Sequence, residues 1–342
     1  MPLMRAARFY EGSKSLRVEE VPRPEPGPGE ALVRVRAAGV CHTELHFLDG
    51  LLPPGKSPLV LGHEVAGVVE ALSGQAPGLQ VGERVVAYYY APCGRCRCCR
   101  RGWENLCANL RGQLGFLTDG GFAEYVVVAA DSLVPLPERV SFEAGATLAC
   151  GATTALHALR EIAGVRLGET VVVYGVGGVG LAMVQMAKRM GVRVIAVSRT
   201  AAKLERAAAL GADHTINAAE QDPVEAVRMA TDGAGADAVF ELVGVRETMD
   251  SAAAMLGKRG RLVFIGYSTD DFVVSPINLV IGEQVVTASV GNTLTELQEV
   301  VRLASEGAIQ PVVARTFPLD QINDALELLR AGELVGRAVL LP

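Results

Sequence analysis

Four cysteines in one short stretch have the spacing of a metal-binding loop. Cys93, Cys96, Cys99 and Cys107 follow the pattern C-x2-C-x2-C-x7-C. Thiolates this close together can surround a tetrahedral zinc ion and leave no open position, which is typical of a structural site. An iron–sulfur cluster or a redox loop is the alternative, but the Cys-Pro ending of bacterial ferredoxins is missing. We therefore expect structural zinc here, with Cys98 as a free thiol.

Further reactive side chains lie in two segments upstream of this loop, GVCHTELH and LGHE, and at one position downstream. The candidates are, in chain order, Cys41, Thr43, His46, His63, Glu64 and Cys150. Taken singly, a cysteine is most often a small buried hydrophobic residue. A single histidine in an apolar stretch is most often a core residue with its hydrogen bonds satisfied. The residue types alone therefore leave the roles of these side chains open.

A glycine-rich turn in the middle of the chain has the spacing of a nucleotide-binding motif. Gly175, Gly177 and Gly180 form a G-x-G-x-x-G pattern between an apolar run, 171–174, and a helix-favouring segment, 181–190. Such a run is typical of a strand buried on both faces. The glycines allow a tight turn and bring a pyrophosphate close to the helix N-terminus. Because the turn lies between strand and helix, we predict a dinucleotide site rather than a packing turn.

The end of the next predicted strand, 193–197, bears on which dinucleotide binds. NAD-binding proteins usually carry Asp or Glu there to hold the ribose 2′-hydroxyl. This chain has Ser198, Arg199 and Thr200, with Lys203 close behind. A guanidinium and a hydroxyl suit a 2′-phosphate, because Arg presents paired donors and keeps its charge. We therefore favour NADP(H) over NAD(H), the alternative being that Arg199 is a solvated loop residue.

The elements that must position these residues are of two kinds. Up to about residue 150, short apolar runs separated by Gly and Pro indicate a barrel-like or sandwich domain. Its expected strands are 32–37, 65–71, 85–90 and 125–129. Beyond it, strands alternate with helices, with helices expected at 201–210 and 224–230 and strands at 238–243, 262–266 and 285–290. Two amphipathic segments after residue 292 are expected to be helices that return to cover the first domain.

Length, charge and composition set limits on the function. A chain of 342 residues with 50% hydrophobic and 20% charged residues suggests two domains with an ample core. Net charge is −6 without a basic tract, so neither nucleic acid nor an anionic membrane is an expected partner. No signal segment is visible, so we expect a cytoplasmic protein. Its seven cysteines then indicate metal or redox chemistry rather than disulfides.

Together these motifs resemble zinc-dependent medium-chain alcohol dehydrogenases, of the medium-chain dehydrogenase/reductase superfamily. The Cys-His-Thr-x-x-His segment, GHE, the cysteine loop and GVGGVG occur in the family's order. The resemblance runs from end to end, including GGFAEY and the closing QINDALELLRAGELVGRAVL. It implies an α/β fold. A GroES-like β-rich catalytic domain, 1–151 and 292–342, would be split by a Rossmann domain, 152–291, with a doubly wound parallel sheet.

The resemblance also implies two Zn²⁺ ions per chain, one of them in the cysteine loop. Cys41, His63 and Cys150 match the family's ligands of the catalytic zinc. This Cys₂His set is the known one of alcohol dehydrogenases rather than a deduction from spacing, and it leaves one position for an alcohol oxygen. Glu64 matches the acidic residue beside that zinc, either as a neighbour or as an occasional ligand.

The family's proton relay and cofactor contacts can be matched in the same way. Thr43 and His46 correspond to a relay from the substrate hydroxyl, through Thr43 and a cofactor ribose hydroxyl, to His46 and solvent. The expected cofactor contacts are His42, Thr154, Gly175, Gly177, Gly178, Val179, Gly180, Ser198, Arg199, Lys203 and Ile265.

The implied activity is reversible hydride transfer between an alcohol and a nicotinamide cofactor, giving an aldehyde or ketone. Tyr89, Phe116 and Tyr267 correspond to pocket positions, which favours medium-sized apolar or aromatic alcohols. The edge strand 285–290 is expected to join subunits into a homodimer or homotetramer. The alternatives are an NADPH-dependent enoyl, acryloyl-CoA or quinone reductase on the same scaffold and, as a non-enzyme, a cofactor-binding structural or sensor protein.

Overall fold

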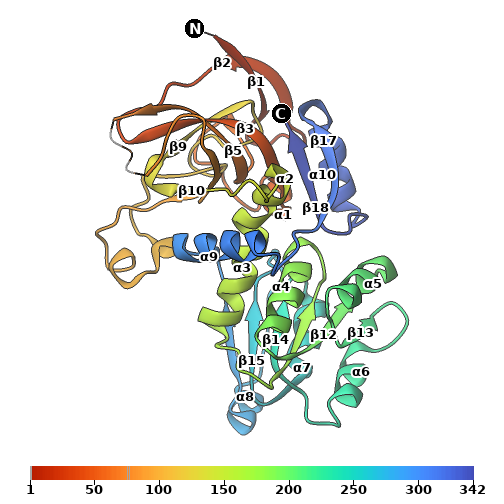
Figure 1. Ribbon diagram of the computed structural model, residues 1–342. Helices are drawn as coiled ribbons and strands as arrows, with labels where there is room; N and C mark the ends of the chain where they lie inside the picture. The colour runs from red at the N-terminus through yellow and green to blue at the C-terminus, as the bar shows by residue number, and fades with distance from the viewer. Residues whose placement is uncertain (1, 75, 77) are drawn as a thin grey trace. The chain divides into compact units, whose positions relative to one another are not determined.

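The computed structural model describes residues 2–74, 76 and 78–342, which divide into two units. The first unit consists of Met1–Thr153 and Asn292–Pro342, and the second of Thr154–Gly291. The chain thus leaves the first unit once and returns to it, as the colours of Figure 1 show. Among the described residues, helices are too short or too polar to cross a membrane.

The first unit is rich in strands, as its short apolar runs predict. Its largest sheet has the order β10-β6-β5-β3-β18-β17, with β9 also paired to β3. In β3 (Glu30–Val40) the residues on one face are buried, while Arg34 and Arg36 are exposed on the other. The other strands are β1 (Leu3–Phe9), β2 (Arg17–Pro22), β4 (Leu59–Val60), β5 (Glu64–Ser73), β6 (Arg84–Ala87), β7 (Tyr90–Ala91), β8 (Gly112–Gln113), β9 (Tyr125–Ala129), β10 (Leu133–Pro135), β17 (Val313–Pro318) and β18 (Arg337–Leu341).

Short helices complete the first unit. They are α1 (His42–Asp49), α2 (Phe142–Thr147), α9 (Leu294–Ser305) and α10 (Ile322–Arg330), with turns η1 (Cys99–Arg101), η2 (Glu104–Leu106), η3 (Ala130–Ser132), η4 (Leu148–Ala152) and η6 (Leu319–Gln321). Helices α9 and α10 are the two amphipathic helices predicted after residue 292. Helix α9 begins with a capping box of Thr293 and Glu296 and buries Leu297, Val300 and Val301.

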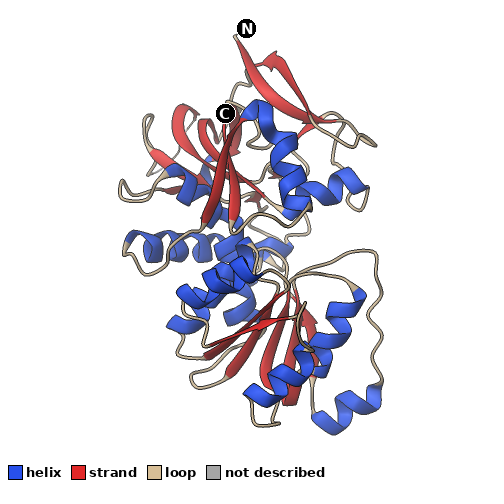
Figure 2. Ribbon diagram, turned by 90° about the vertical axis from the view of Figure 1, so that its right-hand side faces the viewer, coloured by secondary structure: helices blue, strands red, loops and turns tan. Residues whose placement is uncertain are grey.

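The second unit is a parallel sheet of order β13-β12-β11-β14-β15-β16, with helices on both sides (Figure 2). The doubly wound sheet expected from the sequence is therefore confirmed. Its strands are β11 (Thr170–Tyr174), β12 (Arg193–Ser198), β13 (His214–Asn217), β14 (Ala236–Glu241), β15 (Leu256–Phe264) and β16 (Val285–Ala288). Its helices are α3 (Thr153–His157), which continues into η5 (Ala158–Ile162), α4 (Gly178–Arg189), α5 (Ala201–Ala209), α6 (Pro223–Ala230), α7 (Arg246–Ala254) and α8 (Pro276–Gly282).

The strand order reverses between β11 and β14, and ligands of such sheets bind at the carboxyl ends of the strands beside this reversal. The glycine-rich turn follows β11 and therefore lies at that position. Val172, Ile195 and Val239 are fully buried between the layers and fix the sheet under it. The fold thus presents the predicted nucleotide motif at the edge where the topology favours a ligand.

Several predicted strands end earlier than expected. The strand predicted at 85–90 stops at Ala87, because its partner β10 begins opposite that residue. The strand predicted at 238–243 stops at Glu241, whose carboxylate accepts hydrogen bonds from the N–H groups of Val243 and Gly244 and so stabilises a turn. The strand predicted at 285–290 stops at Ala288, where its partner β15 ends.

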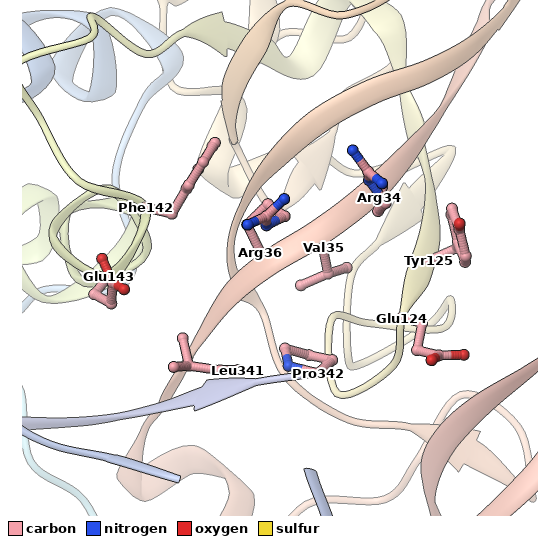
Figure 3. Close-up of a pocket in the computed structure, with 9 residues that line it drawn as sticks. All are labelled: Arg34, Val35, Arg36, Glu124, Tyr125, Phe142, Glu143, Leu341 and Pro342. Atoms are coloured by element: carbon pink, nitrogen blue, oxygen red, sulfur yellow. The ribbon is translucent and has the colours of Figure 1, made fainter. Parts of the chain in front are cut away.

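Strand β3 changes its partner along one edge. It pairs with β9 up to Arg34 and with β18 from Ala38 onward. A pocket of about 370 Å³ opens at this change, and Arg34, Arg36 and Phe142 are among the side chains that line it (Figure 3). The candidate metal ligands are not among the described residues that line this pocket.

Candidate functional site

Four buried side chains with metal-ligating atoms converge in the first unit. Cys41, His63, Glu64 and Cys150 each place one such atom within 4.8 Å of the others. Cys41 precedes α1, His63 and Glu64 lie at the start of β5, and Cys150 lies in η4, a π-helical turn. Among the described residues, neither carboxylate oxygen of Glu64 makes a hydrogen bond, although both are buried. Two thiols, an imidazole and a carboxylate form a donor set that fits zinc.

The cluster already stabilises one thiolate. A hydrogen bond with the Cys150 thiol lowers the pKa of Cys41 well below the usual thiol value, despite burial. The same hydrogen bond, together with burial, raises the pKa of Cys150. Burial raises the pKa of Glu64 to about 8, against the attraction of Arg337. Because the thiolate is the form of cysteine that binds metal, this arrangement is suited to a cation.

Two buried charged residues beside the cluster are not predicted from the sequence. Glu44 Oε1 lies 3.0 Å from Nδ1 of His63, and Glu44 Oε2 accepts a 2.6 Å hydrogen bond from the Cys41 N–H. In β18, Arg337 lies 2.9 Å from Glu64 Oε1. Contacts of this kind orient metal ligands. The available signals were a glutamate three residues into a helix and a lone arginine in an apolar strand.

Helix α1 carries the predicted proton relay. Thr43 Oγ1 lies 3.6 Å from Cys41 Sγ, so its hydroxyl is next to the candidate metal ligands. His46 lies one turn further, with its ring centroid 5.5 Å from that of His42. Burial lowers the pKa of His46, which favours the neutral imidazole near pH 7.

Aromatic rings lie beside His63, one of the candidate metal ligands. The ring centroids of Tyr89 and Phe116 lie 5.1 Å and 5.4 Å from that of His63, and Phe116 also packs on Phe47 at 5.5 Å. Two of the three predicted pocket residues are therefore beside a candidate ligand. The third, Tyr267, belongs to the second unit and is 45% exposed.

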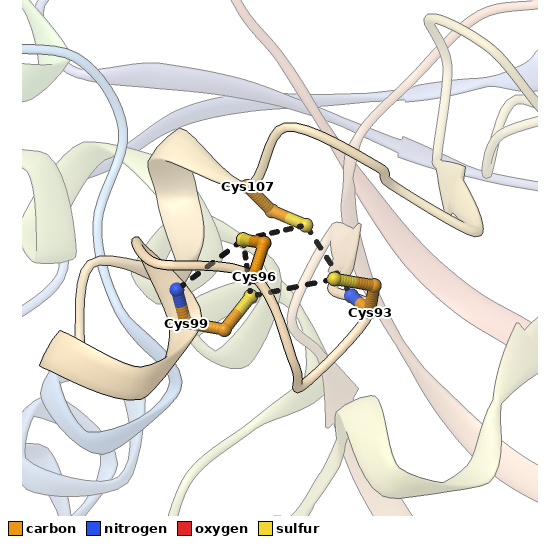
Figure 4. Close-up of side chains that lie close together, drawn as sticks. All are labelled: Cys93, Cys96, Cys99 and Cys107. Atoms are coloured by element: carbon orange, nitrogen blue, oxygen red, sulfur yellow. Dashed lines mark hydrogen bonds between the residues drawn. The ribbon is translucent and has the colours of Figure 1, made fainter.

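The cysteine loop forms a separate cluster of four Sγ atoms, from Cys93, Cys96, Cys99 and Cys107, all within 4.8 Å of one another (Figure 4). Cys96 Sγ lies 3.4 Å from Cys99 Sγ and 3.9 Å from Cys107 Sγ. Hydrogen bonds from the backbone N–H groups of Cys99 and Ala108 lower the pKa of Cys96 to about 6. This donor set of thiols, with backbone N–H groups directed at sulfur, fits a structural zinc ion.

The glycine-rich turn of the second unit has the features of an anion-binding site. Gly175 has φ 104°, a conformation that other residues rarely adopt. A Cβ at Gly180 would collide with the carbonyl oxygen of Gly175, so this glycine serves close packing. A Cβ at Gly177 would meet no protein atom within 4 Å, so protein packing gives no reason for a glycine there. Gly178 and Val179 follow in the first turn of α4, where backbone N–H groups have no acceptor within the helix and can bind an anion.

The other predicted cofactor residues are distributed along the carboxyl edge of this sheet, with two exceptions. Ser198 ends β12, the neighbour of β11, and its Oγ accepts a 3.2 Å hydrogen bond from the Thr200 N–H. Arg199 is exposed and, among the described residues, has no carboxylate within ion-pair distance. Burial lowers the pKa of Lys203. Ile265 follows β15 at the same edge, whereas Thr154 is buried in α3 and His42 belongs to the first unit.

Comparisons with known proteins cover both units of the chain. The family model "Alcohol dehydrogenase GroES-like domain" matches residues 27–138, and "Zinc-binding dehydrogenase" matches residues 178–306. An alcohol dehydrogenase of Geobacillus stearothermophilus is 36% identical, over 98% of this chain and 99% of its own length. An NAD-dependent alcohol dehydrogenase of Sulfurisphaera tokodaii is 35% identical, over 99% of this chain and 100% of its own. The crystal structure of an alcohol dehydrogenase from Aeropyrum pernix is 37% identical with a TM-score of 0.93, covering 99% of this chain and 100% of the other.

Proposed function

Because the chain belongs to the zinc-containing medium-chain alcohol dehydrogenase family, we propose roles for individual residues in the reaction of that family. The protein is a zinc-dependent alcohol dehydrogenase, an oxidoreductase that acts on CH–OH groups, and the family and enzyme class expected from the sequence are confirmed. The proposal is that Cys41, His63 and Cys150 hold the catalytic zinc and that Thr43 and His46 carry the substrate proton.

The observation that best supports the metal assignment is the convergence of these three donors from distant parts of the chain in one buried cluster. A zinc ion bound there would supply a Lewis acid that lowers the pKa of an alcohol and polarises a carbonyl group. Glu44 accepts the Nδ1–H of His63 and so leaves Nε2 as the ligand atom. Glu64 Oε1 is held by Arg337, whereas Oε2 makes no hydrogen bond among the described residues, so Glu64 is a neighbour able to approach the ion.

Proton transfer is assigned to α1. Thr43 lies beside Cys41 and carries a hydroxyl that can accept one proton while it donates another. His46, whose pKa burial lowers, takes up the proton as a neutral imidazole and releases it to solvent. A nicotinamide cofactor, when bound, would supply the acceptor for the hydride that the alcohol carbon loses.

NADP(H) is the cofactor that we propose. The space beside Gly177 and the first turn of α4 support binding of a pyrophosphate. The exposed Arg199 and the neighbouring Ser198 hydroxyl support a ribose 2′-phosphate, because no acidic residue follows β12 directly. The similar enzyme of Sulfurisphaera tokodaii is NAD-dependent, so membership of the family does not decide between the two cofactors.

The substrates that we propose are apolar or aromatic alcohols and their aldehydes or ketones. The faces of Tyr89 and Phe116 beside His63 support this class, since aromatic side chains bury apolar groups well. For the oligomer we propose a homodimer, or a tetramer built from dimers, that forms through β16. This strand lies at the edge of its sheet and can pair with a second copy. The cytoplasmic location stays a prediction from the sequence.

Replacement of one thiol tests the metal assignment. In Cys41→Ser we expect one zinc per chain instead of two, loss of benzyl alcohol oxidation and unchanged NADP(H) binding, because the cofactor residues are intact. Metal analysis, an alcohol assay and calorimetric titration give the three readings. Cys98→Ser is the matched control and should keep both zinc ions and full activity. Two zinc ions and undiminished turnover in Cys41→Ser would refute the assignment.

A further inference from the structure

The cysteine loop is joined to the rest of the first unit at the start of helix α9. Glu104 lies in η2, three residues before Cys107. Its Oε1 accepts a 2.9 Å hydrogen bond from the N–H of Leu294, the first residue of α9 and 190 positions away in the chain. Figure 1 shows the loop, drawn in orange, beside α9. The first N–H groups of a helix have no partner within the helix, and a carboxylate there also interacts favourably with its dipole.

The contact from Glu104 is not duplicated by the other groups that hold this end of α9. In the capping box, Glu296 Oε2 accepts the Thr293 N–H at 2.7 Å, and Thr293 Oγ1 accepts the Glu296 N–H at 3.4 Å. The Tyr88 hydroxyl donates to the carbonyl oxygen of Asn292 at 2.8 Å. None of these bonds involves the N–H of Leu294. Without Glu104 this partly buried donor loses its acceptor, which costs about 1–3 kcal/mol when water cannot replace it.

Helix α9 in turn contacts η4, the turn that carries Cys150. The buried face of α9 includes Leu297 and Val300, and Leu148 and Ala149 of η4 are fully buried. A π-helical turn departs from regular helical hydrogen bonding. Its shape therefore depends on what packs against it. The position of α9 can therefore influence the direction of the Cys150 thiol.

We propose that Glu104 is a positioning residue for the catalytic metal ligand Cys150. It fixes the N-terminus of α9, and α9 supports the π-helical turn that directs the Cys150 thiol into the cluster with Cys41 and His63. The four-cysteine loop, which carries Glu104, thereby contributes to holding the catalytic metal without sharing a ligand with it. The inference rests on the proposed assignment of Cys41, His63 and Cys150 as ligands.

The release of zinc to a coloured chelator tests this role. The wild type should release its two zinc ions in two phases, and Cys41→Ser identifies the catalytic one because it lacks that phase. In Glu104→Ala we expect catalytic zinc to leave about tenfold faster, the scale on which supporting contacts change metal affinity. The zinc of the four-cysteine loop should leave at the wild-type rate. Glu104→Gln retains an acceptor oxygen and should restore slow release.

Leu294→Pro removes the same hydrogen bond by eliminating its donor instead of its acceptor. Proline is well tolerated at the first position of a helix, and Thr293 already has the extended backbone that precedes proline, with φ −104° and ψ 161°. This change removes the N–H and leaves the loop intact, so it should also speed the release of catalytic zinc about tenfold. The double variant Glu104→Ala/Leu294→Pro should be no faster than either single variant, because both remove one hydrogen bond.

Asp222→Ala is the matched control. Asp222 Oδ1 accepts the N–H groups of Val224 and Glu225 at the start of α6, so it caps a helix of the second unit in the same manner. Release of catalytic zinc should be unchanged in this variant. Wild-type release in Glu104→Ala, equal acceleration in Asp222→Ala, or faster loss of loop zinc in Glu104→Ala would each overturn the proposal. One zinc per wild-type chain would instead refute the ligand assignment, and the inference with it.

Discussion

Single residues around the candidate metal ligands show how this protein keeps charged groups buried. Glu44 and Arg337 are 1% and 6% exposed, and each faces a candidate ligand, His63 and Glu64 respectively. Removing one partner of such a buried pair typically costs about 3–5 kcal/mol, because the other charge is left without compensation. The ligands therefore depend on partners from α1 and β18 for their ionisation and their direction.

Arg199 allows the cofactor proposal to be tested at the scale of one side chain. In Arg199→Asp the affinity for NADP⁺ should fall about 10- to 100-fold, since a hydrogen bond to a charged group is worth about 1.5–3 kcal/mol. Affinity for NAD⁺ should rise, because a carboxylate can accept from a ribose 2′-hydroxyl. Calorimetric titration of wild type and variant with both cofactors measures this. A wild type that binds NAD⁺ more tightly than NADP⁺ would contradict the proposal.

At the scale of elements, two glycines in the turn from β11 into α4 differ in whether packing requires them. Gly180 has to be glycine because the carbonyl oxygen of Gly175 is so close. Gly177 has open space at the position of a Cβ, so packing gives no reason for its lack of a side chain, and we propose that a ligand does. One short turn thus combines a glycine required by packing with a glycine that packing does not require.

The two glycines should respond differently to alanine. In Gly177→Ala we expect the dissociation constant for the dinucleotide to rise at least about tenfold, or ~1.4 kcal/mol, with little change in Tm. In Gly180→Ala we expect Tm to fall by several degrees, because overpacking costs about 1–3 kcal/mol. Titration calorimetry and thermal unfolding of both variants decide the matter. Equal losses of Tm would show that Gly177 is also a packing residue.

Local patterns in the sequence predict some elements well and others poorly, for physical reasons. Strand 125–129 is recovered as β9, and the helix predicted at 224–230 agrees with α6, because hydrophobic period and caps are local signals. The ends of β14 and β16 depend on a buried carboxylate and on the length of a partner strand, which no local pattern contains. Glu44 and Arg337 were missed for the same reason, since burial of a charge is a property of the folded chain.

At the scale of the whole molecule, the apolar surface around α8 and β16 has the character of a protein–protein interface. The exposed fractions are 61% for Ile277, 74% for Val280, 72% for Ile281 and 50% for Val285. Exposed apolar residues that gather beside a free sheet edge are typical of an interface, and a strand edge of this kind would otherwise favour aggregation. A second copy of the chain is the occupant that we propose.

A charge at this surface should separate the subunits. In Ile281→Glu we expect the dissociation constant of the dimer to rise at least about 30-fold, which corresponds to ~2 kcal/mol, the scale of an interface hot spot. Sedimentation over a range of protein concentrations measures it. Leu167→Glu is the control, because Leu167 is 83% exposed in the same unit but belongs to neither α8 nor β16. A wild type that sediments as a monomer throughout would disprove the interface.

The π-helical turn at Cys150 makes the proposed catalytic metal site sensitive to chain length as well as to residue type. Such a turn holds one residue more than an α-helical turn, and it lies between α2 and α3 in a continuous helical segment. If Ala149 were deleted, this turn could close into an α-helical turn, and the residues within it would change direction by up to about 100°, the angle between successive residues of an α-helix. All ligand side chains would still be present in the chain. The thiol of Cys150 would no longer face Cys41 and His63. The one extra residue of this turn is therefore as important to the proposed metal site as any of its ligands.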